Sequence, residues 1–244
     1  MSRNGAQDVP MLVVDGLVKR FGGFRALDGA NLTLGRGEIL GLVGPNGSGK
    51  TTCINVVSGI YRPDGGRVLL EGDPIGGLPS HRLVHLGVNR TFQIPKPFLT
   101  FTVRQNVEVA VAYGREPHGD PLVFLAFVGL ESLADREAST LNSAQQKLLD
   151  LARALATRPS LLLVDELAAG LNPAELEAVA EKLLSLAKDG VSLLVVEHLL
   201  GFIDRIADRV VVMNAGRDIF HGGLAEASQD PTVVEVFLGG SHGG

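Results

Sequence analysis

An apolar run that leads straight into a glycine-rich loop with a lysine constrains this chain most strongly. The run is ILGLV, at Ile39 to Val43, and the loop is GPNGSGKTT, at Gly44 to Thr52. Together they match G-x-x-x-x-G-K-[ST] between a strand and a helix, where backbone N–H groups surround phosphate oxygens. The positive end of the following helix adds to the attraction for anions. The pattern predicts a phosphate-binding loop at the carboxyl end of a buried strand.

The whole loop is expected to contact a nucleoside triphosphate. Lys50 is predicted to reach the β- and γ-phosphates, and the Thr51 hydroxyl to hold Mg²⁺. The other loop residues predicted to bind nucleotide are Gly44, Pro45, Asn46, Gly47, Ser48, Gly49 and Thr52. The alternative is a glycine-rich turn that merely contains a lysine, and the flanking strand and helix argue against it.

A second apolar run, Leu161 to Val164, ends in two adjacent carboxylates, Asp165 and Glu166. Asp165 is predicted to hold Mg²⁺, directly or through water. Glu166 stands at the sheet edge, where it can align a water for in-line attack. The alternative is that the two acids only cap the next turn, and the presence of a phosphate loop argues against it. The two motifs together predict a Mg²⁺-dependent nucleoside triphosphatase.

Short apolar runs alternate with longer helical patterns, which predicts an α/β fold with a mainly parallel sheet. Buried strands are expected at Ile39 to Val43, Leu161 to Val164, Ser192 to Val196 and Arg209 to Met213. Shorter, turn-bounded strands at Leu12 to Val14, Asn31 to Leu34 and Arg67 to Leu70 predict an antiparallel β portion. Helices are expected at Lys50 to Gly59, Val103 to Ala112, Ser143 to Thr157 and Pro173 to Lys188.

The segment from Pro95 to Thr140 has helical patterning, which predicts a helical lobe inserted between two halves of the sheet. We therefore expect a single domain over residues 1–244, with a sheet core at about 11–94 and 159–244 and a helical lobe at about 95–158.

Composition and charge limit the partners and the cellular compartments that are expected for this chain. A formal charge of −5 over 244 residues provides no general attraction to nucleic acid, so no nucleic-acid partner is predicted. The one cysteine, Cys53, excludes an internal disulfide and is expected to be buried. The N-terminal stretch has no apolar segment typical of a signal peptide. The apolar run Pro121 to Leu130 is about half of the roughly 20 residues that a membrane-spanning helix needs.

The ordered motifs resemble those of the ATP-binding subunits of ATP-binding cassette (ABC) transporters. Besides the phosphate loop and LLLVDE, they are KRFGG, RTFQ, LNSAQQ, AGLNP and VEH, and the resemblance covers about Leu12 to Leu238. It implies the ABC ATPase fold, with a P-loop NTPase core, and ATP and Mg²⁺ as the bound groups. It also implies Phe21 as an aromatic that stacks on adenine, although Phe21 could instead be a core residue.

The resemblance further implies three residues around the γ-phosphate. Glu166 would act as general base, Gln93 would sense Mg²⁺ and the attacking water, and His198 would be the switch histidine that touches the γ-phosphate. The implied metal ligands are Thr51, Gln93 and Asp165.

The element LNSAQ matches the family signature, which covers the γ-phosphate held by a second subunit. Its residues are Asn142, Ser143, Ala144 and Gln145, at a helix N-terminus whose free N–H groups attract anions. The usual form is LSGGQ, and both glycines are replaced here. An alanine forced to a positive φ is expected to cost about 1–2 kcal/mol. The predicted consequence is a weaker composite site with the partner's phosphate loop.

The closest resemblance is to the branched-chain amino acid transporter ATPases, in RTFQ, AAGLNP and VEH. It implies an ATPase subunit of an importer, peripheral at the cytoplasmic face of the membrane and paired with a second ATPase subunit, identical or different. Integral membrane permease subunits would dock near Gln93 to Phe101, and a periplasmic or extracellular binding protein would act only indirectly. The alternatives are a non-transport or lipid-export ABC ATPase, or a regulatory nucleotide-binding module with weak turnover.

Overall fold

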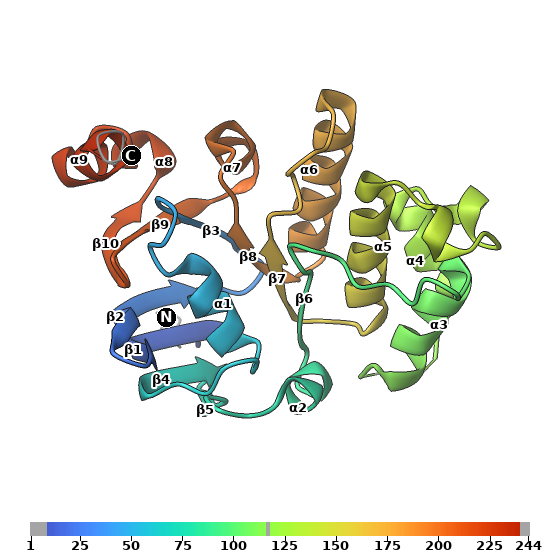
Figure 1. Ribbon diagram of the computed structural model, residues 1–244, viewed down its shortest axis with the longest axis horizontal. Coiled ribbons are helices and arrows are strands. Elements are labelled where there is room, and N and C mark those ends of the chain that lie inside the picture. Colours follow the sequence, from blue (N-terminus) through green and yellow to red (C-terminus); the bar gives the residue numbers. More distant parts are fainter. Residues whose placement is uncertain (1–8, 116–117, 240–244) are drawn as a thin grey trace, which may run out of the picture.

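The computed structural model describes residues 9–115 and 118–239, which form two β-sheets with helices around them (Figure 1). The larger sheet has six strands in the order β10-β9-β3-β8-β7-β6, and the smaller has four in the order β2-β1-β4-β5. The strands of the larger sheet are β3 (Ile39–Val43), β6 (Val88–Arg90), β7 (Leu161–Asp165), β8 (Ser192–Val196), β9 (Arg209–Asn214) and β10 (Arg217–Gly222). Those of the smaller are β1 (Leu12–Phe21), β2 (Phe24–Leu34), β4 (Gly65–Leu70) and β5 (Asp73–Pro74).

The larger sheet is parallel except at one edge. β3 pairs in parallel with both β8 and β9, and β7 pairs in parallel with β8 and β6. Only β10, next to β9, is antiparallel. The predicted α/β fold with a mainly parallel sheet is therefore confirmed, and the four apolar runs assigned to it are β3, β7, β8 and β9.

The central strand β3 is apolar throughout because both of its faces are covered. Ile39 and Val43 pack into a cluster with α3 to α7, while Leu40 and Leu42 pack into a second cluster with α1 and the antiparallel sheet. Successive side chains of a strand point to opposite faces, so a strand between two clusters needs an uninterrupted apolar run.

The antiparallel portion is confirmed, but its strands are longer than the sequence predicted. β1 pairs antiparallel with β2 and with β4, and the β1–β2 hairpin turns at Gly22 and Gly23 between Phe21 and Phe24. The predicted strands covered only the buried ends of β1 and β2. Their outer halves are partly exposed and carry charged residues, so they lack the apolar signal on which the prediction depended.

All four predicted helices are present, with ends that differ by no more than about one turn. They are α1 (Lys50–Val57), α3 (Val103–Tyr113), α5 (Ser143–Ala156) and α6 (Pro173–Lys188). Asn172 caps α6 in a capping box with Glu175. The remaining helices are α2 (Ser80–His85), α4 (Pro121–Val128), α7 (Leu200–Ile206), α8 (Leu224–Ala227) and α9 (Pro231–Gly239), with 3₁₀ turns at Glu131–Leu133 and Ala138–Thr140.

Helices α3, α4 and α5 lie together at the side of the sheet marked by β6 and β7, on the right in Figure 1. All three lie within residues 95–158, the range predicted for the helical lobe. Cys53, on α1, is fully buried, and its burial raises the pKa of the thiol to about 12. It is a structural cysteine, as predicted.

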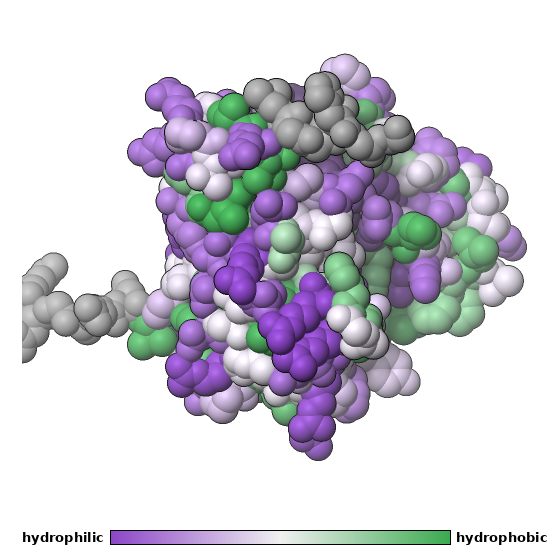
Figure 2. Space-filling model, turned by 60° about the vertical axis from the view of Figure 1, so that its left-hand side comes forward, coloured by the Kyte–Doolittle hydropathy of each residue, from purple (hydrophilic) through white to green (hydrophobic). Residues whose placement is uncertain are grey.

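The surface is mixed in character. On the face drawn in Figure 2, hydrophobic residues form separate patches among hydrophilic ones. Within residues 9–115 and 118–239, none of the helices combines the length and the apolar character needed to cross a bilayer. The N-terminal stretch considered for a signal peptide falls mostly in residues 1–8, outside the described residues.

Candidate nucleotide site

A cleft of about 400 Å³ brings most of the predicted site residues together at the carboxyl edge of the parallel sheet. They come from the segments that follow β3, β6, β7 and β8, because the carboxyl ends of parallel strands meet at one edge. Its lining residues are Phe24, Ala26, Asn46, Gly47, Ser48, Gly49, Lys50, Thr51, Thr52, Gln93, Glu166 and His198.

The loop between β3 and α1 depends on glycine at two close approaches. Gly44 has φ 148° and Gly49 has φ 107°, values that side chains rarely allow. A Cβ at Gly44 would lie 2.2 Å from the backbone oxygen of Met213, and one at Gly49 would lie 2.7 Å from that of Ala26. These glycines let the loop fold tightly at the start of α1, where its N–H groups can face a phosphate.

Lys50 supplies the positive charge of the loop. Its Nζ donates hydrogen bonds to the Gly44 oxygen at 2.8 Å and to the Pro45 oxygen at 2.9 Å, so the ammonium lies across the loop. Burial lowers the pKa of Lys50, and the charges of Glu166 and Asp165 oppose that shift. A bound triphosphate would stabilise the ammonium further, since opposite charges favour each other's ionised forms.

Glu166 lies between the two other residues predicted to surround the γ-phosphate. His198 Nε2 is 2.8 Å from Glu166 Oε1, and Gln93 Nε2 donates to Glu166 Oε2. The backbone of Glu166 has φ 50°, a left-handed value that is uncommon for a residue with a side chain. Three loops that are distant in sequence thus place one carboxylate between an imidazole and an amide.

Asp165, the last residue of β7, is almost fully buried and pairs with a residue that sequence reasoning missed. Arg90 Nη2 donates to Asp165 Oδ2 at 2.9 Å, and Arg90 also donates to Asn55 Oδ1 and Ser58 Oγ. Burial raises the pKa of Asp165, and the charge of Arg90 opposes that shift. Its position beside Thr91 and Gln93 in RTFQ was the available signal for Arg90.

The donor set fits Mg²⁺. Asp165 Oδ1 is buried and has no hydrogen-bond partner among the described residues, so one carboxylate oxygen remains unsatisfied there. Thr51 and Gln93, which line the cleft, add a hydroxyl and an amide oxygen. Mg²⁺ binds such oxygen ligands and usually keeps several waters.

The structure places a second phenylalanine closer to the cleft than the one that the sequence predicted. Phe21, at the end of β1, is partly exposed and packs edge-on against Tyr61 with ring centroids 5.1 Å apart. Phe24, its partner across the hairpin, is 65% exposed and lines the cleft. A stacking role for Phe21 stays a prediction, and Phe24 is a further candidate that follows the Gly-Gly turn of RFGGF.

The residues Asn142, Ser143, Ala144 and Gln145 do not line this cleft; they form the N-terminus of α5. The Asn142 side chain accepts from the Gln145 N–H at 2.8 Å, and the Gln145 side chain accepts from the Asn142 N–H, so they form a capping box. Ala144 lies within the helix and does not have a positive φ. The predicted strain from replacing glycine by alanine is therefore wrong, because a helical φ suits any residue.

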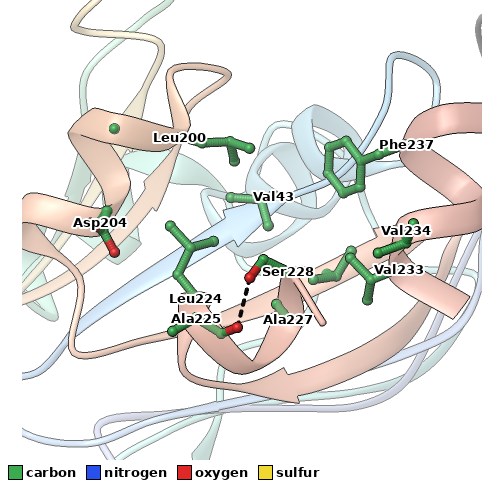
Figure 3. A pocket seen from close by; sticks show the side chains of 12 residues that line it. Val43, Leu200, Asp204, Leu224, Ala225, Ala227, Ser228, Val233, Val234 and Phe237 are labelled. Carbon is green, nitrogen blue, oxygen red and sulfur yellow. Dashed lines mark hydrogen bonds between the residues drawn. The ribbon is translucent and has the colours of Figure 1, made fainter. Parts of the chain in front are cut away.

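A larger, apolar cavity of about 600 Å³ lies elsewhere, among β3, α7, α8 and α9 (Figure 3). Leu200 and Phe237 point into it from opposite sides, with Val43 between them in the view. Its polar side chains are Asp204 and Ser228, and neither carries a positive charge to balance a phosphate, so the smaller cleft with Lys50 is the candidate nucleotide site.

The comparisons with known proteins agree with this geometry. A model of the ABC transporter family matches residues 27–169, which include the phosphate loop, Gln93, the signature residues and Glu166. The match covers more than half of the chain. The chain belongs to this family. As an ABC ATPase it binds nucleotide and hydrolyses ATP.

Relatives and solved structures cover nearly all of this ABC ATPase. A probable branched-chain amino acid transport ATP-binding protein LivG from Archaeoglobus fulgidus is 40% identical over 94% of this chain and 95% of its own. An ABC transporter cassette solved in its ADP conformation is 33% identical, with TM-score 0.84 over 94% of this chain and 99% of that one. A dimeric ATP-binding cassette with ADP and Pi is 25% identical, with TM-score 0.79 over 88% and 99% of the two chains. They confirm the predicted ABC ATPase fold.

Proposed function

We propose that this chain is the ATP-hydrolysing subunit of an importer for branched-chain or related amino acids, in which Glu166 is the general base. The observation that carries the chemistry is the Glu166 carboxylate, held between Gln93 and His198 in the cleft that contains the phosphate loop. The substrate class is supported by the 40% identity to a probable branched-chain amino acid transport ATP-binding protein, LivG.

In this proposal, different residues of the chain bind the phosphates, accept the proton and hold the metal ion during hydrolysis. The loop N–H groups and Lys50 bind the phosphates and stabilise charge on the transferred phosphoryl group. Glu166 accepts a proton from the attacking water, while Gln93 and His198 orient the carboxylate. Mg²⁺, held by Thr51, Gln93 and Asp165, would neutralise charge on the β- and γ-phosphates when bound. An aromatic surface of Phe21 and Phe24 would receive the adenine.

We further infer that two ATPase subunits pair head to tail, so that the α5 N-terminus of one covers the γ-phosphate bound by the other. The exposed position of Asn142 and Ser143 supports that role, as do the N–H groups of Ser143 and Ala144, which the capping box does not use. The dimeric state of a 25% identical cassette also supports pairing, with an identical or a different subunit.

Permease subunits of the membrane would dock on the segment that leads from Phe92 to Phe101. Its exposed apolar side chains support this: Phe92 41%, Ile94 73%, Phe98 45%, Leu99 51% and Phe101 40%. Such a contact would make the chain peripheral at the cytoplasmic face of the membrane. A solute-binding protein on the far side would act on this chain only through the permease.

The test is the Glu166→Gln variant, which keeps the shape of the side chain but cannot accept the proton. We expect ATP turnover to be lost while ATP binding remains, and light scattering to detect a dimer that forms only with Mg-ATP. The control is Glu181→Gln, an exposed glutamate on α6, which should behave as wild type. Unchanged turnover in Glu166→Gln would refute the base assignment. A variant that binds ATP but stays monomeric would show that pairing requires a different ATPase subunit or the membrane partner.

A further inference from the structure

Lys147, in the second turn of α5, reaches out of its helix to the loop that carries Glu166. The residue is 7% exposed, and its Nζ donates to the backbone oxygens of Glu166 and Ala169, both at 2.7 Å. Burial lowers the pKa of Lys147, and the charges of Glu197 and Glu166 oppose that shift. Burying an ammonium costs free energy, which these two charge-assisted hydrogen bonds offset. Lys147 is therefore held firmly against the Glu166 loop.

Glu197 also binds the loop that carries Glu166. It follows β8 and precedes His198, is 2% exposed, and its Oε1 accepts the Ala168 N–H at 2.7 Å. Burial raises the pKa of Glu197 to about 7, while the Ala168 N–H and the charge of Lys147 act in the opposite direction. The backbone from Glu166 to Ala169 is therefore held by a cation on α5 and an acid beside the switch histidine.

We propose that Lys147 and Glu197 are positioning residues that keep the Glu166 carboxylate between Gln93 and His198, and that Lys147 couples this arrangement to the signature end of α5. The inference rests on the proposed role of Glu166 as general base. The left-handed backbone at Glu166, φ 50°, needs such support, because unfavourable conformations persist only where surrounding contacts hold them.

The coupling follows from what α5 contacts along its length. Asn142 caps its N-terminus, Lys147 binds the Glu166 loop, and one turn later Asp150 Oδ2 accepts the Phe92 N–H at 2.7 Å. Phe92 precedes Gln93, so one rigid helix is attached to the segments on both sides of the Gln93–Glu166 hydrogen bond. A force on the signature end, where the partner's nucleotide would bind, therefore reaches the chain's own general base.

The first test separates ATP binding from hydrolysis. Lys147→Met removes the ammonium and is expected to lower the single-turnover hydrolysis rate at least about ten-fold, equivalent to about 1.4 kcal/mol. The Kd for ATP should change less than about two-fold, because the hydrogen bonds of Lys147 go to the backbone of Glu166 and Ala169 rather than to the phosphate loop. Lys147→Arg should restore most of the rate. Lys188→Met, at an exposed position on α6, is the matched control and should match wild type.

Glu197 is tested in the same way. Glu197→Leu removes the acceptor for the Ala168 N–H and should lower the hydrolysis rate with little effect on the Kd for ATP. Glu197→Gln keeps an acceptor oxygen and should lose less. Each variant is assayed well below its own melting temperature. A hydrolysis rate that follows only the folded fraction, with no rescue by Lys147→Arg or Glu197→Gln, would overturn the proposal.

A double-variant cycle tests whether Lys147 acts through Glu166. In the Glu166→Gln background, Lys147→Met should cause little further loss of single-turnover rate, since the group that it positions is already gone. If the double variant loses rate by the product of the two single-variant fold-losses, the two residues act independently and the proposal is overturned. If Glu166→Gln loses hydrolysis while Lys147→Met retains it, the coupling is wrong and the base assignment stands. If Glu166→Gln retains hydrolysis, both are wrong.

Discussion

Replacement of Arg90 by methionine should destabilise the fold far more than the loss of an ordinary arginine. The guanidinium and the Asp165 carboxylate are 7% and 1% exposed and lie 2.9 Å apart. At an effective dielectric constant of about 20, unit charges about 4 Å apart attract by about 4 kcal/mol. Arg90→Met removes that attraction and leaves Asp165 in a buried position without its partner, for which losses of about 3–5 kcal/mol are typical.

The matched control is Arg67→Met. Arg67 pairs with Asp15 at the surface, where both side chains are well exposed, so its loss should cost less than about 1 kcal/mol. The free energy of unfolding is measured by urea denaturation without nucleotide or Mg²⁺. Because Asp165 is the group left uncompensated, Arg90→Met combined with Asp165→Asn should recover much of the loss. A loss in Arg90→Met no larger than in Arg67→Met, or simple additivity in the double variant, would refute this account.

Two further measurements address the aromatic surface and pH. Phe24→Ala should weaken ATP binding by about 1–3 kcal/mol, the contribution of base stacking on an aromatic ring. Isothermal titration calorimetry of this variant and of Phe21→Ala identifies the ring that binds adenine. An effect confined to Phe21→Ala would contradict the assignment of Phe24 to the adenine site. Burial raises the pKa of Glu197 from 4.5 to about 7, so folding takes up a proton between these values and stability falls as pH rises through them. Relative to Glu197→Gln, the wild-type free energy of unfolding should therefore fall by about 3 kcal/mol from pH 4.5 to pH 8, and a constant difference over that range would contradict the shift.

Elements with two buried faces were predictable from the sequence. Both ends of β3 and of β8 match the predicted runs, because a strand covered on both faces is buried from end to end and consists mostly of apolar residues. The outer halves of β1 and β2 were missed since partial exposure removes that signal. The phosphate loop was recognisable because its chemistry depends on neighbours in sequence.

Contacts between distant residues were not predictable in the same way. Arg90 and Asp165 are 75 residues apart, and although Arg90 begins the motif RTFQ, nothing in its sequence neighbours shows that it pairs with Asp165. Phe24 lines the cleft only because the hairpin places it there. The strain expected at Ala144 is absent since α5 begins at Ser143, where the helix was predicted to begin, and a residue inside a helix has a negative φ.

The burial of Cys53 also makes the chain convenient for spectroscopy. It is the one thiol among 244 residues, it is fully buried on α1, and its raised pKa keeps it in the unreactive protonated form. Maleimide reagents should therefore leave the folded wild-type protein unlabelled. Cysteines introduced in pairs, for example on α5 and on the antiparallel sheet, could carry fluorophores without removal of the native thiol. Distance changes between the helical and β portions during ATP turnover would then be measurable on an otherwise unaltered chain.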